Sequence, residues 1–258
     1  MLHNIWLRAL MAAPPTSGEP LSLLGITIRR SIIIGRAALI YGTAMSLLLA
    51  IALGFSSPTS FSSGFPIFLP IFAIVGSMGG LTVFTSDRLK GVLEYLMAYG
   101  ISPRRLFVNV LLASLVLVTI VLGIALGFGL GLFLVRGNSL SDVLVLLLAA
   151  YTLPMSYASA AFAATVGMYW SALSSPRQGL NSPVGLAPFI GILPSLATLG
   201  TIVALSVAAT HHVALPPPTS SSFIIVTSAS LVMVATVVMV LLSMIGRFLR
   251  RERLLSPA

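Results

Sequence analysis

Six uncharged apolar runs constrain this chain more than any other feature of its sequence. A helix rises about 1.5 Å per residue, so about 20 apolar residues cross the hydrocarbon core of a bilayer. No Asp, Glu, Lys, Arg or His lies within any of the runs, which cover residues 37–55, 66–84, 106–135, 143–173, 184–209 and 223–245. The expected fold class is therefore an all-α polytopic membrane protein with six transmembrane helices.

The composition excludes most soluble classes of protein. Hydrophobic residues make up 57% of the 258 residues and charged residues 7%, against roughly 25% charged residues in an ordinary soluble domain. A cytosolic enzyme, a secreted domain and a disordered regulator are excluded on this ground. The net charge of +9 would suggest nucleic acid in a soluble protein. Here the charges flank apolar runs, so we expect the lipid bilayer as a partner and no nucleic acid.

The basic residues predict the orientation. Every Lys and Arg except Arg136 falls before the first run, between the second and third, between the fourth and fifth, or after the sixth. The positive-inside rule places these segments and both termini in the cytoplasm. We therefore expect a multi-pass protein of the cell membrane.

Three regions follow from this topology. Residues 1–36 form a cytoplasmic N-terminal segment, 37–246 the six-span domain, and 247–258 a basic cytoplasmic tail. The stretch 21–36 mixes apolar residues with Arg29, Arg30 and Arg36. It predicts an amphipathic helix at the membrane surface, with a continuation of the first span and snorkelling arginines as the alternative.

The segment between the second and third spans is the most patterned polar region. Ser86 or Asp87 is a candidate N-cap, and Gly100 followed by Ser102-Pro103 predicts a stop and a restart. Val92, Leu93, Leu96 and Met97 share one helical face, and Lys90 and Glu94 are i,i+4 neighbours. These features predict a helix of about ten residues, which is either a solvated connector on the membrane surface or a docking helix for a cytoplasmic partner.

The run from Asp87 to Leu96, followed by Gly100 to Arg105, resembles the charged-Lys-Gly-x-Leu-Glu-x-Leu and Ser-x-Arg segment of type-2 ABC exporter permeases. The likeness covers the whole chain as topology and about 20 residues as motif. Asp87-Arg88 departs from the Glu-rich lead of that family. The resemblance implies a permease that pairs with a second copy or a paralogue. It also implies a coupling helix that contacts an ABC ATPase subunit through Asp87, Arg88, Lys90, Gly91, Leu93, Glu94, Leu96 and Met97.

The chain lacks a nucleotide site of its own. A Walker A loop requires Gly-Lys-Ser/Thr, whereas the only lysine, Lys90, is followed by Gly91 and Val92. We expect no enzymatic activity and no cofactor in this chain, with ATP and Mg²⁺ bound by the partner ATPase. An exporter of an amphipathic or hydrophobic cargo fits the uncharged spans. A secondary carrier or channel, and a membrane scaffold that does not transport, are the alternatives.

Other patterns have structural interpretations. The stripes Gly76/Gly80 and Gly123/Gly127/Gly131 allow close helix approach, and we expect packing within the chain in preference to a dimer seam. Three prolines within spans could kink them: Pro154, Pro188 and Pro194. The adjacent pair His211-His212 does not share a helix face, and we expect no metal site.

Overall fold

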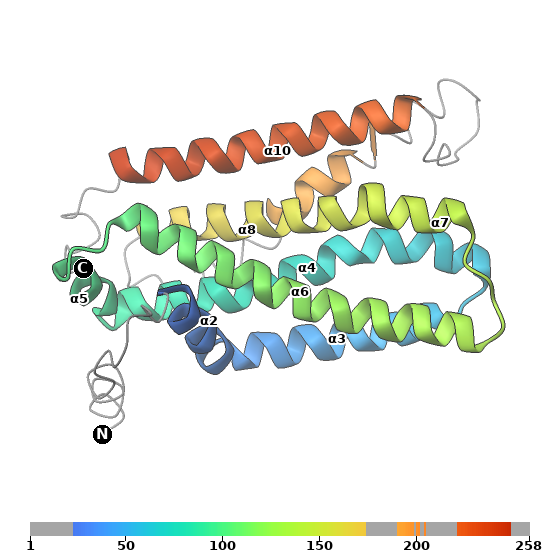
Figure 1. Ribbon diagram of the computed structural model, residues 1–258, viewed down its shortest axis with the longest axis horizontal. Coiled ribbons are helices and arrows are strands. Elements are labelled where there is room, and N and C mark those ends of the chain that lie inside the picture. Colours follow the sequence, from blue (N-terminus) through green and yellow to red (C-terminus); the bar gives the residue numbers. More distant parts are fainter. Residues whose placement is uncertain (1–22, 174–189, 199, 202–203, 205–220, 249–258) are drawn as a thin grey trace, which may run out of the picture.

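The computed structural model describes residues 23–173, 190–198, 200–201, 204 and 221–248 (Figure 1), and every element in these ranges is a helix. The long helices lie side by side and run between two ends of one bundle. The elements are α2 (Leu23–Ile34), α3 (Arg36–Gly54), α4 (Pro58–Leu89), α5 (Val92–Ala98), α6 (Pro103–Val135), α7 (Asp142–Leu147), the π-helical turn η1 (Leu148–Thr152), α8 (Leu153–Leu173) and α10 (Ser221–Phe248). Residues 190–198 are also helical.

Four helical stretches are long and apolar enough to cross a membrane, or five if one bent pair counts as a span. The four are Ile67–Leu89, Pro103–Val135, Leu144–Ala172 and Phe223–Met244. They correspond to the second, third, fourth and sixth apolar runs, so the chain is a helical multi-pass membrane protein. The first run corresponds to α3, which passes the same test only together with α2, across a bend of 73°. The fifth run lies partly outside the described residues, and its described part, 190–198, is helical.

The helix α4 lies at the centre of the bundle. Its membrane-crossing window is 72% buried, whereas that of α10 is 17% buried. Glycines let α4 approach its neighbours: a Cβ at Gly76 would lie 3.1 Å from the Val118 Cα, and one at Gly80 only 1.9 Å from the Ser114 Oγ. The prediction that Gly76 and Gly80 pack within the chain is confirmed.

The second glycine stripe behaves differently. No described atom lies within 4 Å of a Cβ built at Gly123, Gly127 or Gly131. The preference for packing within the chain is therefore wrong for this stripe as far as the described residues go. Leu117, Val121 and Ala125, on the other side of α6, are fully buried. That face turns toward the core and leaves the glycines at the periphery.

The helix that carries the fourth span changes its winding at η1. Pro154 is the second residue of α8, the helix that follows this turn. A proline ring crowds the backbone carbonyl four residues earlier, and the wider π-turn lies at that position. The Thr152 hydroxyl donates to the Leu147 carbonyl at 3.2 Å, and the Ser156 hydroxyl donates to the Thr152 carbonyl at 2.5 Å. The expected irregularity at Pro154 is thus a π-turn. Pro188 lies outside the described residues.

At the end of the bundle opposite α5, Arg136 has a structural role. Its guanidinium donates to the carbonyl oxygens of Phe55 and Ser56 and lies 5.7 Å from the centre of the Phe55 ring. These carbonyls follow the C-terminus of α3, where a helix leaves acceptors unpaired. The one basic residue that departs from the charge asymmetry therefore caps a neighbouring helix.

Candidate functional site: the connection between α4 and α6

The short helix α5 is set off from its neighbours by two glycines in the left-handed region. Gly91 has φ 69° and precedes Val92, the first residue of α5, and Gly100 has φ 83° and follows its C-cap Tyr99. Residues other than glycine rarely adopt such angles. Ser102 then caps α6 by accepting from the Arg105 amide at 3.3 Å, with Pro103 as the first residue of that helix. The predicted stop and restart are confirmed.

The start of this helix was predicted too early. Ser86 and Asp87 lie in the last turns of α4, which ends at Leu89 with Lys90 as its C-cap. Neither residue caps α5, which has seven residues where about ten were expected. The reason is local: no Gly or Pro stands between Gly80 and Gly91, so the helix of the second span continues until Gly91 allows the chain to turn.

The apolar face of α5 packs onto the bundle. Leu93 is 4% exposed and Met97 1%, and both belong to the same core cluster as Phe84 and Phe107. The rings of Phe84 and Phe107 meet edge to face with centroids 4.8 Å apart. This contact joins α4 to α6 within the cluster that also holds Leu93 and Met97 of α5. Leu96 is half-buried against this cluster. The apolar residues thus attach α5 to the two long helices and do not form an exposed contact surface.

The exposed side of α5 carries two tyrosines that the sequence analysis did not single out. Tyr95 and Tyr99 are 38% and 70% exposed, and their rings lie 4.6 Å apart. The Tyr95 hydroxyl donates to that of Tyr99 at 3.0 Å. This hydrogen bond raises the pKa of Tyr95 above its ordinary value. Their i,i+4 spacing, opposite Leu93 and Met97, was the signal available in the sequence.

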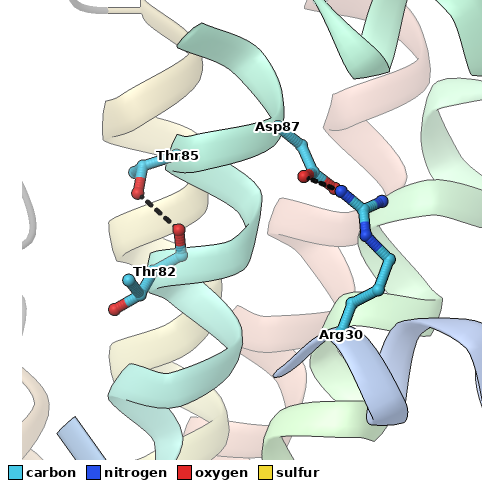
Figure 2. A network of polar contacts seen from close by, with 4 residues as sticks. All are labelled: Arg30, Thr82, Thr85 and Asp87. Carbon is cyan, nitrogen blue, oxygen red and sulfur yellow. Dashed lines mark hydrogen bonds and ion pairs between the residues drawn. The ribbon is translucent and has the colours of Figure 1, made fainter. Parts of the chain in front are cut away.

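Asp87 has a partner within the chain. Its carboxylate accepts from the Arg30 guanidinium on α2, as Figure 2 shows, and the two side chains are only 7% and 16% exposed. Thr82 and Thr85, one turn earlier in α4, bond back to carbonyls of their own helix. The pair therefore ties α2 to the last turn of α4, a few residues before α5 begins.

The remaining residues of the predicted contact differ in exposure. Lys90 is exposed, and Arg88 and Gly91 are half-buried. The side chain of Glu94 lies outside the described set, so its predicted pairing with Lys90 is not described. The structure brings these residues to one end of the bundle together with Arg29, Arg36, Arg104 and Arg105, all exposed.

The described interior of the bundle offers hydroxyl groups. Ser159 and Ser195 are buried and hydrogen-bonded at 2.6 Å, which links α8 to the 190–198 helix. The Tyr151 hydroxyl is buried beside Phe223 and has no hydrogen-bond partner among the described residues. Within the same residues no three His, Cys, Asp or Glu side chains come together to hold a metal ion, and His211-His212 falls outside them.

Comparisons of the chain with protein-family models, with curated proteins and with solved structures find no match.

Proposed function

We propose that this chain is the permease subunit of an ATP-driven exporter, working with a separate ATPase subunit and a second permease chain. The proposal rests on the motif from Asp87 to Arg105 and on one structural observation. The short helix α5 sits at one end of the bundle, attached on its inner side through Leu93 and Met97 and exposed on its outer side. Such a helix can receive a push from a partner and pass it directly to α4 and α6.

The contact residues that we now propose differ in part from those expected from the motif. Leu93 and Met97 transmit the movement from inside, while Tyr95, Tyr99 and Lys90 face outward and meet the ATPase. Tyrosine suits this role because it offers a large, rigid contact area and is enriched among the residues that dominate binding energy. A neutral phenol also costs less free energy to bury in an interface than a charged side chain does. Exposed charges contribute little to binding unless they are desolvated.

The cargo that we propose is amphipathic or hydrophobic. Ionisable residues within spans mark proton and ion pathways, and the six apolar runs contain no Asp, Glu, Lys, Arg or His. The buried Tyr151 hydroxyl, which has no hydrogen-bond partner among the described residues, can bond a polar group on an otherwise apolar molecule. In this proposal the cell membrane houses the complex, with α5 on the cytoplasmic side.

The test removes the exposed aromatic face of α5 and leaves its attachment intact. Tyr95→Ala with Tyr99→Ala should weaken co-purification of the ATPase from native membranes by on the order of 30-fold, or about 2 kcal/mol, while the permease still inserts and folds. Tyr41→Ala is the matched control, because Tyr41 is 74% exposed on α3, away from α5. It should leave the association unchanged.

The alternatives predict other results. A secondary carrier would move cargo with an ion gradient and without any co-purifying ATPase. A scaffold would retain its partners and transport nothing. If the tyrosine pair left ATPase association and cargo-stimulated ATP hydrolysis untouched, α5 would not be the coupling element.

A further inference from the structure

We propose that the outward face of α2 is a binding surface for anionic lipid headgroups. Arg29 and Arg36 would hold the phosphates, and Ile32 and Ile33 would lie at the start of the acyl chains. This inference goes beyond the proposed function and holds for any activity of the chain.

The pattern of exposure defines the surface. Gly25, Arg29, Ile32 and Ile33 are exposed at positions i, i+4, i+7 and i+8, which form one face of α2. Ser31 is fully buried, and Arg30 points inward to Asp87. Arg36 is exposed just after the bend at Gly35. Two isoleucines, 45% and 40% exposed, thus stand between two exposed arginines.

The apolar part of this surface continues onto a helix with the composition of a membrane span. Beyond Arg36, α3 exposes Ile40, Tyr41, Met45 and Leu48, each at least 59%. Side chains of this kind on a 19-residue apolar helix require acyl chains around them. The acyl phase around α3 would then end near Arg36. Because α2 turns away from α3 by 73°, α2 would lie at the headgroup level, with Ile32 and Ile33 against the ends of the acyl chains.

Charge selects an anionic lipid as the occupant. Arg30 and Asp87 form the only ion pair found among the described residues, so the charge of Arg30 is compensated within the chain. No described carboxylate pairs with Arg29 or Arg36. A guanidinium at the membrane surface binds phosphate through two parallel hydrogen bonds, and each basic residue near an anionic leaflet strengthens association about five-fold.

The surface is held in place from behind. A Cβ at Gly35 would lie 2.9 Å from the Gly79 Cα, so the bend between α2 and α3 sits directly against the backbone of α4. The Arg30–Asp87 pair fixes the other side of α2 to the end of the same helix. A preformed surface loses little conformational entropy when lipid binds. Through the Arg30–Asp87 pair, lipid bound to α2 would also stabilise the position of the last turn of α4, which leads to α5.

The experiment compares two pairs of arginines at the same end of the bundle. The delipidated protein is titrated with phosphatidylglycerol or phosphatidylcholine, and bound lipid is counted by native mass spectrometry. Thermal unfolding is followed in nanodiscs of each lipid. Arg29→Gln with Arg36→Gln is the test variant. Arg104→Gln with Arg105→Gln removes the same charge from the exposed start of α6 and is the control. Arg29→Lys with Arg36→Lys keeps the charge.

We expect phosphatidylglycerol to bind and stabilise the wild type more than phosphatidylcholine does. The glutamine variant of α2 should bind phosphatidylglycerol about 25-fold more weakly, at about five-fold per arginine, and lose the extra stabilisation. The control should keep most of it. The lysine variant, which keeps the charge but not the paired hydrogen bonds of the guanidinium, should fall between the control and the glutamine variant. Equal losses from both arginine pairs would indicate a diffuse surface charge and overturn the proposal. An unchanged lipid preference in the α2 variant would also overturn the proposal. This holds even if the variant lost its second permease chain or its ATPase, because that loss would concern the proposed function and not the lipid site.

Discussion

At the scale of single residues, neighbouring arginines on α2 have opposite environments. Arg29 is exposed, whereas Arg30 is largely buried against Asp87. In an apolar surrounding, each buried charge carries a large desolvation cost that only its partner offsets. The pair therefore stabilises one orientation of α2 relative to α4, because any other orientation would leave a carboxylate without its guanidinium.

This arrangement predicts how substitution and reversal of the pair change stability. Arg30→Ala should destabilise the protein by at most about 3–5 kcal/mol. The Asp87 side chain is then buried without its guanidinium, and taking up a proton offsets part of this cost. Arg29→Ala, at the exposed neighbouring position, should cost less than about 0.5 kcal/mol in detergent without anionic lipid. The reversed pair, Arg30→Asp with Asp87→Arg, should recover part of the loss. Denaturant titration in micelles measures all three, and equal costs for the two alanine variants would contradict the role of the pair.

The sequence could single out Asp87 as a candidate cap and contact residue, but it could not identify Arg30 as its partner. Arg30 lies 57 residues earlier, and no spacing rule connects two helices that meet only in the folded bundle. The sequence also showed Leu93 and Met97 on one helical face without showing what that face would contact. Their burial depends on Phe84 and Phe107, which lie on different helices.

At the scale of elements, the same glycine spacing has two outcomes. Gly80 on α4 brings the helix against Ser114 and Val110 of α6, whereas Gly127 on α6 faces no described atom within 4 Å. The spacing is identical, and only the orientation of each helix within the bundle separates them. Hence the sequence could predict close approach but not which stripe would provide it.

Two alanine substitutions test this difference. Gly80→Ala should destabilise the protein by about 1–3 kcal/mol, since its Cβ would lie 3.2 Å from the Val110 carbonyl oxygen and would collide with the Ser114 side chain. Gly127→Ala meets no described atom, so it should be neutral or stabilising by up to about 1 kcal/mol, the difference in helix propensity. Thermal unfolding in micelles measures both. A larger loss at Gly127 than at Gly80 would mean that the α6 stripe packs against something in the isolated chain.

Element boundaries depended on local chemistry. The starts at Pro58, Pro103 and Asp142 follow serines whose hydroxyls accept a backbone amide, so the sequence carries clear signals there. The end of α4 did not follow such a rule. Ser86 and Asp87 are good capping residues, but a helix already in progress continues through them, because no Gly or Pro stands between Gly80 and Gly91. The Arg30–Asp87 pair then adds a tertiary contact to this last turn.

At the scale of the whole molecule, hydropathy predicted most of the architecture. Four of the six apolar runs are membrane-length helices, and a fifth candidate arises when α2 and α3 count as one bent span. In lipid, an apolar run has no water to bond its backbone N–H and C=O groups, and a helix satisfies all of these groups within the run itself. The surface helix expected over 21–36 implies a bend before the first span, and α2 and α3 are separate helices at 73°. The angle itself was not predictable, because Gly35 and Gly79 approach each other from different helices of the bundle.

Charge along the described bundle leads to a prediction of orientation. Arg29, Arg36, Lys90, Arg104 and Arg105 are exposed at the α5 end, whereas the other end has Arg136, which caps α3. The positive-inside rule then places the α5 end in the cytoplasm.

The chain contains no cysteine, so single cysteines can report on each end. A membrane-impermeant maleimide applied to intact cells should label Ser139→Cys, at the far end, and should label Ala98→Cys on α5 only after permeabilisation. Both positions are exposed, so failure to label cannot be attributed to burial in the bundle. The reverse result would mean that the protein has the opposite orientation in the membrane, with α5 on the outer side, where a cytoplasmic ATPase cannot contact it. Labelling of both cysteines from outside would mean that α6 does not cross the bilayer.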